Sequence, residues 1–120
     1  MTALNMVLTA NVYGKTAAAN LSTVLSNVIV NNLSSSTLVK VNHLMFSNYG
    51  SVTVQGNVFL YRYSTSNGNY ITNNINVPAN STLVVLGKDT PIYLEEGDVV
   101  QASTSTANSL SVISSYENIS

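Results

Sequence analysis

The sequence predicts an all-β protein: a single-domain, jelly-roll-like β-sandwich of about eight antiparallel strands. Three observations predict it. Runs rich in β-branched and aromatic residues recur roughly every 8–12 residues. Clusters of Asn, Ser, Gly and Pro separate these runs, as turns require. Helical periodicity is almost absent, and 120 residues is the usual size of one domain.

The predicted strands follow one another closely, with turn signals between them. Residues 23–31, 51–63 and 70–77 are rich in β-formers, two short strands fall within 77–106, and residues 109–119 form the last strand. Gly56 and Asn57 predict a bulge in the middle of a strand. Residues 64–69 predict a hairpin turn, in which Asn67 and Gly68 can adopt positive φ at low cost.

The segment 35–46 is apolar at successive positions, which an alternating strand places on opposite faces. Strict alternation puts one apolar group on one face and a second group on the other: Leu38, Leu44 and Phe46 against Val39, Val41 and Met45. A strand of this kind is either covered on both sides by its own chain or covered on one side by a partner chain. We therefore expect a homo-oligomer, with a trimer as the first candidate and a monomer as the second.

The first ten residues are apolar but lie outside this rhythm of strands and turns. We expect two parts, an N-terminal arm or edge strand at 1–10 and a sandwich domain at 11–120. Four side chains of the arm should be buried, because leaving each in water forfeits about 1.5–3 kcal/mol relative to burial: Leu4, Met6, Val7 and Leu8. An arm that reaches a neighbouring subunit is favoured over an edge strand of the same chain.

Charge and composition argue against several classes of partner. Only 8% of residues are charged, and the four basic ones are scattered, so we expect no nucleic-acid partner and no polybasic contact with a membrane surface. No apolar run approaches the roughly 20 residues of a membrane-spanning helix. There is no cysteine, and the N-terminus lacks the basic and apolar regions of a signal peptide, so we expect no leader.

Residues suited to catalysis or metal binding are few. The single histidine, His43, lies in the middle of a strand beside apolar residues, which favours a structural or interface role. Carboxylates gather only at Asp89, Glu95, Glu96 and Asp98. They suit either hairpin turns on solvent or a calcium site, and the turn interpretation is favoured because the spacing does not match an EF-hand loop. We expect no enzymatic activity, no catalytic residues, no cofactor and no metal.

The polar and aromatic residues favour binding to other proteins. Asn, Ser and Thr fill more than a third of the chain, the net charge is -1, and such a surface is weakly protected against association. Seven tyrosines exceed the needs of a core this small, and tyrosine is enriched in interfaces. The predicted partner-interface residues are Tyr61 and Tyr63, together with the arm residues Leu4, Met6, Val7 and Leu8. An alternative is a glycan-binding platform formed by these two with Tyr70.

Several segments resemble one known family of proteins. The matching segments are VYGKTAAANLSTVL at 12–25, VPANSTLVVL at 77–86, IYLEEGD at 92–98, ASTSTAN at 102–108 and SYENIS at 115–120. They look like the corresponding parts of small virion structural proteins of tailed phages, notably phages of marine cyanobacteria. The resemblance covers most of the chain from Val12 onward, as a pattern of strands and turns without a catalytic signature.

This resemblance implies a β-sandwich carried on the virion and made in the host cytoplasm. The implied role is that of a capsid decoration or cement protein on the capsid exterior, with the major capsid protein or another virion protein as its partner. A structural role in the tail, the neck or a fibre adaptor is the alternative placement. Low charge and abundant tyrosine agree with a structural role of this kind.

Overall fold

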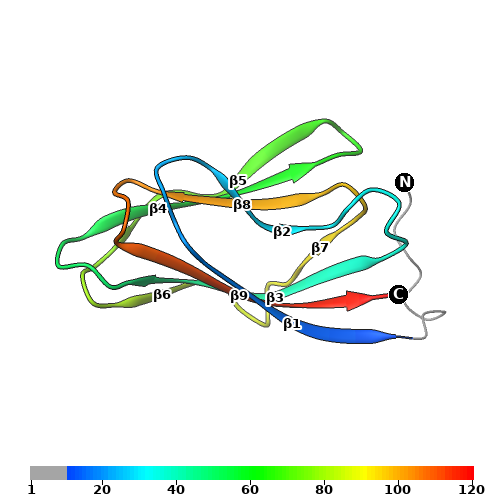
Figure 1. Ribbon diagram of the computed structural model, residues 1–120, viewed down its shortest axis with the longest axis horizontal. Helices are drawn as coiled ribbons and strands as arrows, with labels where there is room; N and C mark the ends of the chain where they lie inside the picture. The colour runs from blue at the N-terminus through cyan, green and yellow to red at the C-terminus, as the bar shows by residue number, and fades with distance from the viewer. Residues whose placement is uncertain (1–10) are drawn as a thin grey trace.

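The computed structural model describes residues 11–120, which form two facing β-sheets and contain no helix, hence none able to cross a membrane (Figure 1). The strands are β1 (Val12–Asn20), β2 (Ser26–Val30), β3 (Leu38–Asn48), β4 (Val54–Arg62), β5 (Asn67–Val77), β6 (Thr82–Leu86), β7 (Ile92–Leu94), β8 (Val99–Thr104) and β9 (Leu110–Ile119). One sheet has the order β1-β9-β3-β6 with β7 also paired to β3, and the other has the order β2-β8-β4-β5.

The pairing of the strands confirms the predicted jelly roll. Strand β1 pairs with β9, β2 with β8, β3 with β6 and β7, and β4 with β5, all antiparallel. The early strands thus pair with the later ones in reverse order, as in one long hairpin rolled into two sheets. Nine strands form in residues 11–120, compared with about eight expected. β1 is not among the individually predicted strands, and the three-residue β7 adds to the edge of β3.

The core lies between the two sheets. Phe46 and Leu44 from β3, Val58 from β4 and Leu110 from β9 are all fully buried. The ring of Phe46 lies directly on the backbone of Gly56, where an added Cβ would stand 2.6 Å from a ring carbon. The predicted bulge at Gly56 is confirmed, because the pairing of β4 with β5 shifts between Gly56 and Val58. The glycine therefore gives the largest core side chain its space.

Contrary to the expectation from the sequence, the side chains of segment 35–46 do not alternate strictly between two faces. The pairing of β3 with β9 shifts between Val41 and His43, so the side-chain order slips by one residue. Val41 before the bulge and Leu44 after it therefore share the core face, while Met45 lies on the outer face and is partly exposed. Leu38 lies outside the core cluster yet is only 4% exposed, so that end of β3 is apolar on both faces, and the homo-oligomer stays a prediction.

The hairpin between β4 and β5 turns earlier than the sequence predicts. Residues 63–66 form the turn, in which the Ser66 N–H donates to the Tyr63 carbonyl at 3.1 Å and Ser66 has a φ of 50°. Asn67 already pairs with Arg62 in the ladder, and Gly68 follows within β5. The predicted hairpin is therefore confirmed, but Asn67 and Gly68 lie in β5 and not in the turn. Gly68 serves another purpose described below.

The predicted arm, residues 1–10 with Leu4, Met6, Val7 and Leu8, lies outside the described residues. Its role as an arm or an edge strand therefore stays a prediction.

Candidate partner-binding surface

The outer face of the four-stranded sheet carries the predicted interface residue Tyr61. Strand register decides this placement. Val58 and its cross-strand partner Ala102 are fully buried in the core. Because side chains alternate along a strand, Phe59 and Tyr61 point away from the core. Their partners on β8 are Gln101 and Val99, which therefore share this outer face.

These outward side chains form an apolar cluster. Phe59 and Tyr70 meet edge to face, with ring centroids 5.0 Å apart and an interplanar angle of 72°. Tyr61 pairs with Val99, which in turn pairs with Val30 on β2. We call this set the outer aromatic patch, and its members are Val30, Phe59, Tyr61, Tyr70 and Val99. Tyr70 is 50% exposed and Val30 42%, so the patch faces solvent in the described residues.

Gly68 provides space for one ring of the patch. A Cβ added to Gly68 would stand 2.2 Å from the Cζ atom of Phe59, so the tip of the ring lies against the glycine. An amide pair borders the ring on its other side, where Gln101 Nε2 donates to the Asn27 Oδ1 at 2.9 Å. The patch is thus an aromatic surface with neutral hydrogen-bonding groups beside it.

Tyr63, the other predicted interface tyrosine, lies just past the end of β4. Its side chain rests on Gly97, where an added Cβ would stand 2.6 Å from the Tyr63 Cβ. The same Cβ would stand 3.0 Å from Leu33, so both side chains border the glycine. Tyr63 is 48% exposed and Leu33 52%. The structure thus places Tyr61 and Tyr63 at the same end of one sheet, with Leu33 as an unpredicted neighbour.

An ion-pair cluster fixes this end of the sheet. The carboxylate of Asp98 has no exposed surface and lies 2.9 Å from Arg62 Nε. Its two oxygens also accept the backbone N–H groups of Tyr63 and Glu95, each at 3.0 Å. Glu95 Oε2 accepts a 2.8 Å hydrogen bond from Arg62 Nη2. Asp98 therefore joins the end of β4 to the turn that precedes β8 and holds the Tyr63 backbone in place.

The loop between β2 and β3 is attached to the same turn. The Asn31 N–H donates to the Asp98 carbonyl at 3.0 Å, and the Gly97 N–H donates back to the Asn31 carbonyl at 2.6 Å. The buried Asn31 side chain donates to the carbonyls of Thr37 and Leu94. These bonds attach the loop between β2 and β3 to the turn that precedes β8.

This geometry revises the interpretation of the acidic residues. Asp98 and Glu96 are buried, and Glu96 accepts a hydrogen bond from the Ser36 N–H, so these two do not lie on solvent as turn residues were expected to. Asp89 lies apart and exposed between β6 and β7. Within residues 11–120 no three histidine, cysteine or acidic side chains gather as metal ligands would.

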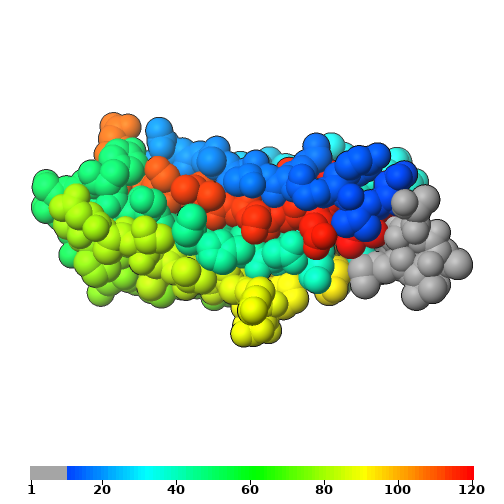
Figure 2. Space-filling model, turned by 90° about the horizontal axis from the view of Figure 1, so that it is seen from below, coloured from blue at the N-terminus to red at the C-terminus, as the bar shows by residue number. Residues whose placement is uncertain are grey.

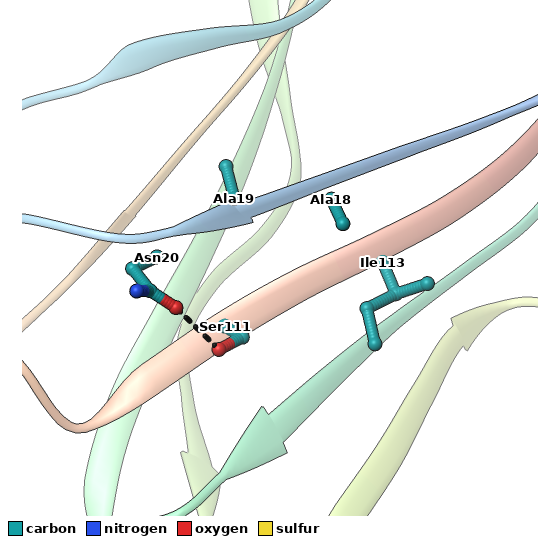
Figure 3. Close-up of a pocket in the computed structure, with 5 residues that line it drawn as sticks. All are labelled: Ala18, Ala19, Asn20, Ser111 and Ile113. Atoms are coloured by element: carbon teal, nitrogen blue, oxygen red, sulfur yellow. Dashed lines mark hydrogen bonds between the residues drawn. The ribbon is translucent and has the colours of Figure 1, made fainter.

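A shallow hollow of about 280 Å³ lies on the outer face of the other sheet, between β1 and β9 (Figure 3). It is lined by Ala18, Ala19, Asn20, Ser111 and Ile113. Ser111 donates a 2.9 Å hydrogen bond to the Asn20 side chain across the two strands. The lining is small and uncharged, so the hollow offers shape and not reactive groups.

The sequence indicated part of this surface and missed the rest. Alternation along residues 57–63 placed Phe59 on the same face as Tyr61 and Tyr63, but nothing local showed that this face points to solvent. Val30, Val99 and Leu33 carry no signal of their own, because each joins the surface through cross-strand pairing or a loop contact.

Comparisons with known proteins show a similar fold in a solved structure. No protein-family model and no curated protein sequence matches the chain. Among solved structures, a protein of the Bacillus endospore appendages, which form a novel family of disulfide-linked pili, is similar at a TM-score of 0.52 and 10% identity. The similarity covers 92% of this chain and 87% of that one, and it is a likeness of fold.

Chains from the Gx and Gt strains of infectious bursal disease virus are similar at TM-scores of 0.48 and 0.44, with 10% and 9% identity. Each match covers 92% of this chain but only 33% and 31% of the viral chains, so this chain spans about a third of their length.

Proposed function

We propose that this chain is a structural protein of a virion, a capsid decoration or cement protein that binds the outer surface of the major capsid shell. The resemblance of residues 12–25 and 77–120 to small virion proteins of tailed phages supports this role, and a jelly-roll sandwich is a fold that viral capsids use. The function is binding without catalysis. A place in the tail, the neck or a fibre adaptor is the alternative within the same class.

The outer aromatic patch carries the proposal. Its five side chains are apolar or aromatic and none is charged. The centres of protein interfaces are likewise enriched in Tyr and Phe and depleted of charge. Tyr61 and Tyr70 come from paired strands, so a partner would bind them with little ordering of the backbone.

Weak binding at one patch suffices for a protein of this kind. A shell presents many identical sites, and contacts to two neighbouring shell subunits convert modest affinities into avidity. A low net charge favours such repeated attachment, because copies bound side by side repel one another little. The expected effect is a shell that resists internal pressure and heat better when the protein is bound.

The test compares virions that carry the protein with virions from a phage in which its gene is deleted. We expect the deletion to lower the temperature at which a DNA-binding dye reports genome release. Adding back the purified protein should restore the temperature of genome release. Adding back the double variant Tyr61→Ser, Tyr70→Ser should not restore it. Tyr49→Ser is the matched control, because Tyr49 is also 50% exposed but lies outside the patch, between β3 and β4.

Two outcomes would contradict the decoration role. One is equal heat resistance of the two kinds of virion. The other is electron microscopy of labelled virions that places the protein on the tail or neck, which would transfer it to the alternative within the same class.

A second candidate function is glycan binding by the same surface, as in a host-adhesion module. The edge-to-face rings of Phe59 and Tyr70 lie beside the Gln101 and Asn27 amides, and this combination of an aromatic surface with neutral hydrogen-bonding groups suits a sugar. A glycan array probed with the wild-type protein and with Tyr70→Ser tests it. Binding that the variant loses would support the adhesion role, and an array without binding would remove it.

A further inference from the structure

In residues 11–120 the two sheets have five edge strands, and four of them are protected against pairing with another chain. The edge strand β7 has only three residues. β2 and β6 have five residues each, and each is paired through a register shift. β5 is longer but has two register shifts, and Asn74 within it has a φ of 56°. Short length and bulges are the devices by which proteins prevent strand addition.

The edge strand β1 has none of these protections. It runs for nine residues in unbroken register with β9 and contains no proline. Figure 2 looks onto the outer face of this sheet, where β1 (blue) forms one margin of the molecule and β6 (yellow-green) the other. A long, regular edge whose single charge is Lys15 is a template on which another strand can pair.

The hydrogen-bonding pattern shows which backbone groups are free. Asn11 and Ser120 exchange two hydrogen bonds of 2.9 Å, which makes them a hydrogen-bonded pair of the ladder. Because such pairs alternate in antiparallel sheets, the odd-numbered residues of β1 bond to β9. The even-numbered residues direct their N–H and C=O groups away from β9, and no strand in residues 11–120 pairs with that side. These residues are Val12, Gly14, Thr16, Ala18 and Asn20.

The side chains of β1 leave this edge accessible. Eight of its nine residues are exposed, so the strand is held mainly by its bonds to β9. Most of its side chains are small, and Lys15 is the single charge. Because β1 buries so little of its own surface, pairing with a second strand would stabilise it.

We infer that β1 pairs antiparallel with β1 of a second copy of this chain, about a twofold axis at Thr16. Full overlap of the two strands sets Val12 opposite Asn20 of the second copy, Gly14 opposite Ala18, and Thr16 opposite Thr16. Every free backbone group named above then has a partner. The two five-stranded sheets join into one continuous sheet, and the proteins form a dimer in solution. This inference does not depend on the proposed virion role.

The sequence of β1 favours this self-pairing. Thr–Thr is a favourable cross-strand pair, and the overlap places Lys15 opposite Ala17 of the second copy. An axis shifted to Lys15 would oppose two lysines, which is unfavourable. The overlap also sets Val12, which is 57% exposed, next to Asn20 of the second copy at the rim of the hollow between β1 and β9.

A cysteine cross-link tests the register. The chain has no cysteine, so Thr16→Cys introduces the sole thiol. Hydrogen-bonded antiparallel partners have Cα atoms about 5.5 Å apart, which a disulfide can span. We expect mild oxidation to convert most of this variant to a disulfide dimer. Thr65→Cys, in the exposed turn between β4 and β5, is the control and should stay largely monomeric.

A proline substitution tests the edge itself. Because the Thr16 N–H points away from β9, Thr16→Pro removes the donor for a second strand without removing a bond to β9. We expect light scattering to show a dimer for the wild type and for Thr16→Val, and a folded monomer for Thr16→Pro. If Thr16→Pro fails to fold, the cross-link of Thr16→Cys still decides.

Three outcomes would overturn the inference. The wild type could be a monomer across the micromolar range, or it could have the mass of a trimer. The third outcome is a dimer that persists in Thr16→Pro while Thr16→Cys forms no disulfide cross-link. Residues 1–10 of the same chain are the competing occupant of the edge. If residues 1–10 pair with β1 instead of a second copy, the wild type is monomeric, and a chain that begins at residue 11 becomes dimeric.

Discussion

Arg62 and Asp98 form an ion pair in which Nε lies 2.9 Å from Oδ2, although the two residues are far apart in the sequence. Asp98 has no exposed surface, whereas the Arg62 side chain is 36% exposed. The Nε atom has no aligned hydrogen-bond acceptor, so the contact is electrostatic. The pair joins β4 to the turn before β8 and so sets the position of the predicted interface residue Tyr63.

Asp98→Asn should destabilise the fold. Asparagine has one side-chain acceptor, so the N–H of either Tyr63 or Glu95 would lose its partner. A buried donor without a partner costs about 1–3 kcal/mol, and we expect the free energy of unfolding in urea to fall by that amount. Asp89→Asn removes the same charge from an exposed turn and should change stability by less than about 0.5 kcal/mol. Equal stability of the two variants would show that the cluster does not hold the turn.

Gly97→Ala should be more harmful than an exposed glycine-to-alanine change normally is. Gly97 has a φ of +89°, and its missing Cβ is the space that the Tyr63 side chain occupies. A non-glycine residue in this conformation costs roughly 1–2 kcal/mol, to which displacement of Tyr63 adds. Gly87→Ala is the control, because nothing lies within 4 Å of an added Cβ there. A thermal-unfolding midpoint that falls for Gly97→Ala and not for Gly87→Ala is the expected result.

Because of the bulge in β3, substitutions at two adjacent residues should lower the free energy of unfolding by very different amounts. Leu44 is fully buried in the core, so Leu44→Ala should cost about 2–5 kcal/mol of unfolding free energy. Met45 lies on the outer face and is partly exposed, so Met45→Ala should cost far less. Strict alternation without the bulge would instead group Met45 with the core residue Val41. A larger loss for Met45→Ala in urea denaturation would contradict the bulge.

Deletion of residues 1–10 tests the predicted arm. Residues 11–120 contain the two sheets and a contiguous core, so we expect the shortened chain to remain folded. If residues 1–10 reach a neighbouring subunit, the shortened chain should attach to virions or assemble more weakly than the full chain. Circular dichroism reports folding, and sedimentation with gene-deleted virions reports attachment. Unfolding of the shortened chain would show that these residues are part of the domain.

The local features of this protein were determined by its sequence. Apolar alternation with a period of two and regularly spaced turn residues predicted the all-β class and the jelly-roll-like sandwich. The bulge at Gly56 was also predicted, because glycine within a strand is a local signal. Asn67-Gly68 carries the same kind of signal, yet the turn forms at residues 63–66 and Gly68 accommodates the Phe59 ring instead.

Only the tertiary structure decided which residues share a face and which strands are left unpaired. Val41 and Leu44 share the core because of a register shift against β9, a strand about seventy residues away in the chain. Asp98 is buried because Arg62 and two backbone N–H groups surround it. Within residues 11–120, the edge of β1 is free because β9 pairs with only one of its sides. Register, burial and edge pairing are properties of two segments together, so neither segment alone specifies them.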